Sequence, residues 1–163
     1  MSKVELTVKD YGTITIEICD DDAPITAENF LSLCREGFYD GLTFHRIIDG
    51  FMIQGGDPTG TGFGGSEKTI KGEFASNGVK NPISHKEGVI SMARSSNPNS
   101  ASSQFFITVG DATFLDGEYA AVGKVTDGDD VARMIAKDAR PVDGNGTIRR
   151  SEQPVIEKIV VIE

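Results

Sequence analysis

The chain has 163 residues, of which 38 % are hydrophobic and 25 % charged, a composition that is ordinary for one globular domain spanning 1–163 and argues against disorder. Its 25 acidic and 16 basic residues give a formal net charge of −9, which repels phosphate backbones and argues against nucleic acid as a primary partner. Its two cysteines are too few for a disulfide framework and form no zinc-binding motif.

The apolar segments of the chain are all short. None approaches the roughly 18 residues that a membrane-spanning helix requires, and the N-terminus, MSKVELTVKD, has no apolar signal core. We therefore expect no membrane contact and a cytoplasmic location. Cys19 and Cys34 both have apolar neighbours and are expected to be buried thiols.

The first elements in chain order are a predicted hairpin and a predicted helix. Apolar and polar residues alternate over 4–18 on either side of Tyr11-Gly12, which is typical of a β-hairpin with one buried face. The acidic residues before Pro24, and Pro24 itself, predict a helix start, and Gly37 predicts its end.

Short strands dominate the rest of the chain. They are predicted at 44–48 and 51–54, then, after a long loop, near 88–93, 103–109, 119–125 and from 154 onward. A second helix is predicted over 127–137, with Val131, Met134 and Ile135 on one apolar face. Many short strands with only two helices indicate an all-β sandwich or barrel, and periodicity does not choose between them.

The long glycine-rich loop, DPTGTGFGGSEKTIKGEF, invites a nucleotide-binding interpretation. That fingerprint must open a helix and be followed about 20 residues later by an acidic partner, but SEKTIKGEF does not have a helical pattern. A mobile loop that closes over a groove is the better interpretation, and a loop of this length is usually functional or held by its own contacts. His45 and His85 lie in no Ser/His/Asp or metal pattern, so a structural role is expected for each.

Arg46 is the feature that composition does not explain, because it lies inside a predicted apolar strand. An unpaired buried guanidinium would cost several kcal/mol, so it should be partnered, exposed or functional. Strand alternation would place Arg46, Gln54 and Gln104 on faces that also carry large apolar side chains. Two interpretations remain open from this pattern: a catalytic group, or an arginine held by two glutamines as a structural clamp.

Several long motifs occur in a fixed order: GTITIEICDDDAPITAENFLSLC, FHRIIDGFMIQGGDPTGTGFGG, HKEGVISMARS, SSQFFIT and FLDGEYAAVGKV. Together they resemble the cyclophilin family of peptidyl-prolyl cis-trans isomerases, and the resemblance extends from Val4 to the end of the chain. It implies a mainly β fold, a closed eight-stranded antiparallel β-barrel capped by two α-helices, with an active groove on its outer surface.

The reaction that the resemblance implies is rotation about the bond before proline, whose barrier is about 18–20 kcal/mol. No bond is broken, so no metal or cofactor is expected. Arg46 matches the catalytic arginine, which donates to the prolyl nitrogen, and Gln54 matches the residue that orients it or binds the substrate backbone. The other matching positions are substrate-binding, in the proline pocket (Phe51, Met52, Phe106, Leu115) and along the groove (Gly62, Ala93, Arg94, Ser95, Gln104).

The chain departs from the common family pattern at the groove. Phe114 replaces a frequent Trp, which removes an indole donor and should weaken binding of cyclosporin, the family's cyclic-peptide inhibitor. Tyr119 replaces a frequent His at the pocket rim, and Arg94-Ser95 replaces Asn-Ala, where the added charge is expected to alter preference beside the proline. The expected partners are proline-containing peptides and unfolded or flexible proteins, bound by a monomer. A proline-recognising binding module, whose role does not depend on turnover, is the alternative.

Overall fold

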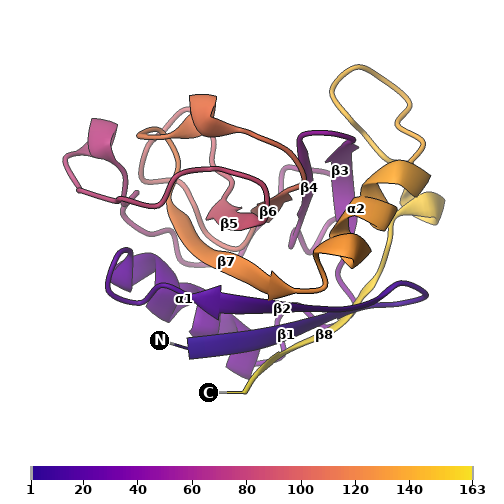
Figure 1. Ribbon diagram of the computed structural model, residues 1–163, viewed down its shortest axis with the longest axis horizontal. Coiled ribbons are helices and arrows are strands. Elements are labelled where there is room, and N and C mark those ends of the chain that lie inside the picture. The colour runs from indigo at the N-terminus through magenta and orange to yellow at the C-terminus, as the bar shows by residue number, and fades with distance from the viewer. Residues whose placement is uncertain (1, 163) are drawn as a thin grey trace.

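The computed structural model describes residues 2–162, and its strands form one eight-stranded antiparallel sheet (Figure 1). The order within the sheet is β3-β4-β6-β5-β7-β2-β1-β8. In chain order the elements are β1 Ser2–Val8, β2 Gly12–Ile18, α1 Pro24–Arg35, β3 Phe44–Ile48, β4 Met52–Gly55, η1 Ala75–Asn77, β5 Val89–Met92, β6 Phe105–Thr108, η2 Thr113–Leu115, β7 Ala121–Asp127, α2 Asp129–Asp138, η3 Arg150–Glu152 and β8 Ile156–Val161.

The sheet curls until its two outermost strands, β3 and β8, approach each other. An antiparallel bridge joins Thr43 to Val155 beside them, and the Ile156 N–H donates to the Leu42 carbonyl at 2.7 Å. The two helices lie on opposite sides of the view in Figure 1, α1 at the left and α2 at the right. The predicted mainly β fold with eight antiparallel strands and two helices is confirmed.

The core lies inside this curl and follows from the alternation seen in the sequence. In the hairpin β1–β2, Leu6 is paired with Ile14 in the register and both are fully buried. Each such side chain contributes about 1.5–3 kcal/mol relative to exposure. Cys19 and Cys34 are buried and free, as predicted.

Helix α1 begins at Pro24, as predicted, but the acidic residues before it provide no side-chain cap. Instead Glu73, which is only 2 % exposed, accepts hydrogen bonds from the Thr26 N–H and hydroxyl, each at 2.6 Å, and from the Ile25 N–H at 3.3 Å. A carboxylate at the positive end of a helix is stabilising. The long loop thus fastens α1 to the sheet through a residue that local sequence could not connect to it.

The structure corrects the predicted buried face of helix α2. The prediction grouped Val131, Met134 and Ile135, but Met134 is 51 % exposed. The buried side chains of α2 are Ala132, Ile135 and Ala136, because positions i, i+3 and i+4 share the face of the helix that is turned away from solvent. No helix within 2–162 has both the length and the apolar character to cross a membrane.

Candidate active site

Arg46 lies on β3 and is half-buried, and two of the three nitrogens of its guanidinium have hydrogen-bond partners. Its Nε donates to the Asn145 carbonyl at 2.7 Å, and its Nη1 donates to the Gln54 side-chain oxygen at 3.1 Å. Gln54 is the residue opposite Arg46 in the β3–β4 register. No hydrogen bond from Nη2 is made within 2–162, so this end of the fork remains free to donate.

A chain of amides continues from Arg46 across the sheet. The Gln54 amide nitrogen donates to the Gln104 side-chain oxygen at 3.0 Å, because β4 pairs with β6 and Gln104 immediately precedes β6. The Gln104 amide nitrogen in turn donates to the carbonyls of Gly62 and Gly64, at 3.0 and 2.8 Å. A guanidinium can only donate hydrogen bonds, so the side-chain oxygen of Gln54 must face Arg46 and its amide nitrogen must face Gln104.

An apolar cavity of about 110 Å³ opens beside the guanidinium. Met52 and Phe106 form its buried walls, at 1 % and 4 % exposure, and Phe106 meets Tyr119 edge-on with ring centroids 5.9 Å apart. The complete lining is Arg46, Phe51, Met52, Gln54, Ala93, Arg94, Phe106, Leu115 and Tyr119, all of them predicted site residues.

The remaining predicted residues lie next to this cavity. Gly62, Ser95 and Gln104 line a second, larger hollow of about 480 Å³, which also contacts Gln54, Ala93 and Arg94. Phe114 is 71 % exposed and lies outside the cavity, with its ring 5.5 Å from that of Phe51. The structure therefore gathers the predicted residues into one groove, with Phe114 at its rim.

The guanidinium of Arg94 does not extend freely into the groove. It lies between the rings of Phe74 and Tyr119, 4.8 and 4.9 Å from their centroids. Its Nε and Nη2 donate to the Glu118 carbonyl at 3.0 and 2.8 Å. An effect of Arg94 on substrate preference would therefore act through the position of the Tyr119 ring. The Arg94 charge itself already interacts with the Glu118 carbonyl and with the two aromatic rings.

Sequence analysis missed a Ser-His-Asp arrangement behind the cavity. The His85 ring makes hydrogen bonds to an Asp116 carboxylate oxygen at 2.8 Å and to the Ser91 hydroxyl at 2.9 Å. Ser91 is fully buried and His85 is 1 % exposed, so the hydroxyl cannot reach a substrate. The His85 ring instead stacks on Phe106, with centroids 6.0 Å apart, and supports the cavity wall.

The ionisation of Asp116 agrees with this supporting role. Burial alone would raise the pKa of Asp116, but hydrogen bonds from Ser84 and from the backbone and ring of His85 outweigh it, so that the net pKa is lowered. A carboxylate that stays ionised holds the His85 ring in place.

The glycine-rich loop is fastened to the protein by Asp57, which is 1 % exposed. Its carboxylate accepts hydrogen bonds from the backbone N–H groups of Thr59, Thr61, Gly62 and Gly64, and from the Thr59 hydroxyl. Of the two expectations for this loop, the one that its own contacts hold it is confirmed. An acidic residue followed by glycines at 60, 62 and 64 was the available sequence signal.

His45 was expected to be structural, and it is buried, at 5 % exposure. It lies at a break in the β3–β4 register between Phe44 and Arg46, and both His45 and Arg46 line a hollow of about 360 Å³. Burial lowers the pKa of His45, and neither ring nitrogen has a hydrogen-bond partner within 2–162. In the same part of the chain, no group of three or more His, Cys, Asp or Glu residues is arranged to hold a metal ion.

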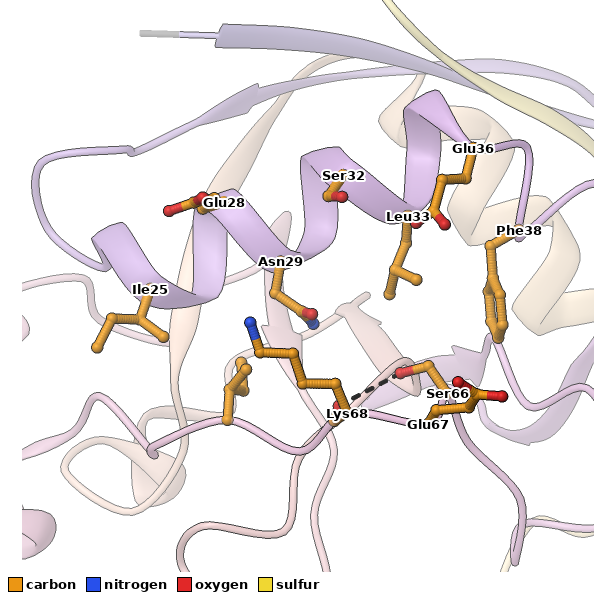
Figure 2. A pocket seen from close by; sticks show the side chains of 11 residues that line it. Ile25, Glu28, Asn29, Ser32, Leu33, Glu36, Phe38, Ser66, Glu67 and Lys68 are labelled. Carbon is orange, nitrogen blue, oxygen red and sulfur yellow. Dashed lines mark hydrogen bonds between the residues drawn. The ribbon is translucent and has the colours of Figure 1, made fainter.

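A larger hollow, of about 590 Å³, lies elsewhere on the protein (Figure 2). It lies between α1 and residues 66–70, and Leu33 and Phe38 point into it. None of the predicted site residues lines it. No arginine lines it, so size alone does not identify the site.

The fold and the groove define a class of protein: a small antiparallel β-barrel whose outer surface combines one guanidinium, two amides and an apolar cavity. A family model described as cyclophilin type peptidyl-prolyl cis-trans isomerase/CLD matches residues 3–161. The chain belongs to this family and is a cyclophilin-type peptidyl-prolyl cis-trans isomerase.

Individual relatives agree with this assignment. A peptidyl-prolyl cis-trans isomerase-like 1 from Rhizopus delemar is 46 % identical over 138 residues, covering 83 % of this chain and 82 % of that protein. A Helicobacter pylori peptidyl-prolyl cis-trans isomerase is 49 % identical over 115 residues, 71 % of this chain and 68 % of that one. The crystal structure of a Cryptosporidium parvum cyclophilin type isomerase in the presence of the dipeptide Ala-Pro has a TM-score of 0.85, 33 % identity and 99 % coverage of both chains.

Proposed function

We propose that Arg46 is the catalytic group of the isomerisation, donating a hydrogen bond to the prolyl nitrogen as the amide twists. In a planar amide, resonance withdraws the nitrogen lone pair, so the nitrogen is a poor acceptor. The lone pair becomes available only as the bond loses double-bond character. A fixed donor therefore binds the twisted form more strongly than either planar isomer, which lowers the barrier.

The observation that carries this proposal is the half-satisfied guanidinium beside the cavity. Asn145 and Gln54 hold Nε and Nη1, and Nη2 has no hydrogen bond within 2–162. Because two atoms of a planar fork are held, the third is oriented without further loss of side-chain freedom. A preorganised donor costs no rearrangement at the moment of reaction.

The apolar cavity is the proposed site for the proline ring. Phe51, Met52, Phe106 and Leu115 provide its walls, and burying the ring there contributes about 2 kcal/mol. Holding the ring still lets the preceding carbonyl swing while the nitrogen stays beside Arg46. Tyr119 and Phe114 form the rim of this proposed pocket.

The substrate backbone is proposed to lie along Gly62, Ala93, Arg94 and Ser95, with Gln54 and Gln104 as hydrogen-bonding partners. The hollow of about 480 Å³ that these residues line supports this path. The presence of Ala-Pro in the structure of the Cryptosporidium parvum relative supports proline-containing peptides as ligands. Unfolded or flexible proteins with accessible X-Pro bonds are the proposed clients, whose slow folding steps the enzyme would accelerate.

Four further properties are proposed on specific grounds. A cytoplasmic location is supported by two buried free thiols, which a reducing compartment preserves. A monomer is supported by the net charge of −9, which opposes self-association. One domain over the whole chain is supported by the single sheet, in which β1 and β8 are neighbours. Weakened cyclosporin binding is supported by Phe114, whose ring offers no N–H donor at the rim.

Isomerisation of a short Ala-Pro peptide, followed by exchange NMR, tests the proposed role of Arg46. We expect wild type to accelerate the exchange and Arg46→Ala to lose at least about tenfold, equivalent to about 1.4 kcal/mol. Arg140→Ala is the matched control, since Arg140 is exposed and makes no side-chain hydrogen bond within 2–162. An undiminished rate in Arg46→Ala would remove Arg46 from the mechanism.

A further inference from the structure

Phe63 is 96 % exposed, more than any other large apolar side chain within 2–162. A single exposed apolar residue is common on protein surfaces and needs no explanation by itself. Phe63 differs because of where it lies and how firmly the backbone on both sides of it is held.

The backbone on each side of Phe63 is attached to the groove. The N–H groups of Gly62 and Gly64 donate to the Asp57 carboxylate at 2.6 and 3.1 Å. Their carbonyls accept from the Gln104 amide at 3.0 and 2.8 Å. The tip of the loop is therefore tied both to a buried carboxylate and to the amide chain that begins at Arg46.

The space around the tip explains why its neighbours are glycines. A Cβ on Gly64 would lie 2.1 Å from an Asp57 oxygen, and one on Gly65 would lie 2.3 Å from the Ser102 hydroxyl. Within 62–65, Phe63 is thus the only residue with a side chain, and that side chain points outward. A ring carried on a backbone that is already held in place can bind a partner without the cost of ordering a loop.

Phe63 also stands at the boundary between two hollows beside the proposed catalytic group. One, of about 480 Å³, contains Gln54 and Ala93, and the other, of about 360 Å³, contains Arg46 and Asn145. An extended peptide advances about 3.3 Å per residue. A peptide whose proline occupies the apolar cavity would therefore bring a residue just outside the X-Pro pair within reach of the ring.

We propose that Phe63 is a specificity-determining residue that binds a large apolar side chain of the client two or three positions from the proline. This rests on the proposed placement of proline beside Arg46. The ring carries no charge and both faces are open to solvent, so it recognises aliphatic or aromatic groups by burying apolar surface. The preferred substrates are then X-Pro bonds in apolar segments, which are the segments that a folding protein buries.

Matched peptides with one X-Pro bond test this proposal. Each carries either Phe or Ser at one position, two or three residues before or after the proline, and kcat/KM is measured by exchange NMR for wild type, Phe63→Ser and Phe63→Leu. We expect wild type to prefer Phe over Ser at one of these positions by about fivefold, equivalent to about 1 kcal/mol. Phe63→Ser should lose the preference and Phe63→Leu should keep part of it, while all three enzymes turn over the Ser peptides equally.

The control variant is Met134→Ser, which removes an exposed apolar side chain from α2 and should leave the preference intact. Absence of any preference in wild type, or its persistence in Phe63→Ser, would overturn the proposal. Failure of the proposed catalytic site is separately visible, because Arg46→Ala would then turn over the Ser peptides as fast as wild type does.

Discussion

Replacing Asp57 with Asn keeps the shape of the buried side chain but removes its charge and one acceptor. In the wild type, one carboxylate oxygen accepts from the N–H and the hydroxyl of Thr59, both at 2.8 Å. The other accepts from the N–H groups of Thr61, Gly62 and Gly64, at 3.2, 2.6 and 3.1 Å. In either orientation of the new side-chain amide, its NH₂ group faces protein groups that also donate hydrogen bonds.

The less costly orientation places the NH₂ toward Thr59, because the hydroxyl can rotate and accept. The Thr59 N–H is then left without an acceptor, at about 1–3 kcal/mol. The three bonds to the remaining oxygen lose their charge assistance, which roughly halves the strength of such bonds. Together these losses predict that Asp57→Asn lowers the free energy of unfolding by about 2–4 kcal/mol.

Urea unfolding and amide hydrogen exchange measure this effect. We expect a lower urea midpoint for Asp57→Asn and faster exchange at the Gly62 and Gly64 amides. Asp127→Asn, at the exposed end of β7, should match wild type. If Asp57→Asn kept the wild-type midpoint and the same protected amides, Asp57 would not be what holds the loop.

The environments of Asp57, Cys34 and Phe114 can each be tested by one measurement. Burial alone would raise the pKa of Asp57, but the hydrogen bonds from Thr59, Gly64 and Gly62 lower it overall. The stabilising contribution of Asp57 is therefore complete above the unfolded pKa of about 3.8 and is lost as the pH falls through the folded pKa. The free energy of unfolding of Asp57→Asn should depend less on pH in acid than that of wild type. Equal slopes of unfolding free energy against pH would contradict this. Burial raises the pKa of Cys34 to about 12, so iodoacetamide should modify it far more slowly in the native protein than in urea at neutral pH, and equal rates would be contrary evidence. Phe114→Trp restores an N–H donor at the rim and should tighten cyclosporin binding severalfold by calorimetry; an unchanged Kd would show that the indole is not the missing contact.

The parts of the fold that sequence predicts well are those with local causes. The β1–β2 hairpin follows from alternation around one turn, and the start of α1 follows from Pro24. The cap of α1 by Glu73, 47 residues from Thr26, has no local signature. Met134 was misplaced because helical spacing cannot tell which side of a short helix faces the sheet.

The contacts of the candidate site also divide into local ones, which the sequence predicts, and long-range ones, which it does not. Arg46 and Gln54 are paired across one tight turn, so strand alternation suffices to bring them near each other. The bond from Gln54 to Gln104 joins residues 50 positions apart, which the order of strands in the sheet explains. The bond from Arg46 to Asn145 spans 99 positions and depends on the loop after α2, which forms an isolated bridge between Thr147 and Arg46. The site residues could nevertheless be predicted from the sequence, because several motifs taken together resemble a known family.

The buried Ser-His-Asp arrangement behind Phe106 could not be predicted from the sequence for the same reason. Asp116 lies 31 positions from His85, too far for a spacing rule, and Ser91 shows no nucleophile motif. Three-dimensional burial then decides its role, because a fully buried hydroxyl cannot attack a bound polypeptide. Ser91, His85 and Asp116 are residue types that suit nucleophilic catalysis, but here they support a wall of the cavity.

Arg46 is proposed to act on the twisted amide and not on peptide binding. Exchange NMR on one Ala-Pro peptide gives both the dissociation constant and the isomerisation rate within the complex. For Arg46→Ala we predict a rate at least about tenfold lower with a Kd within about threefold of wild type. An unchanged rate within the complex, with affinity alone reduced, would contradict the account and assign Arg46 to binding.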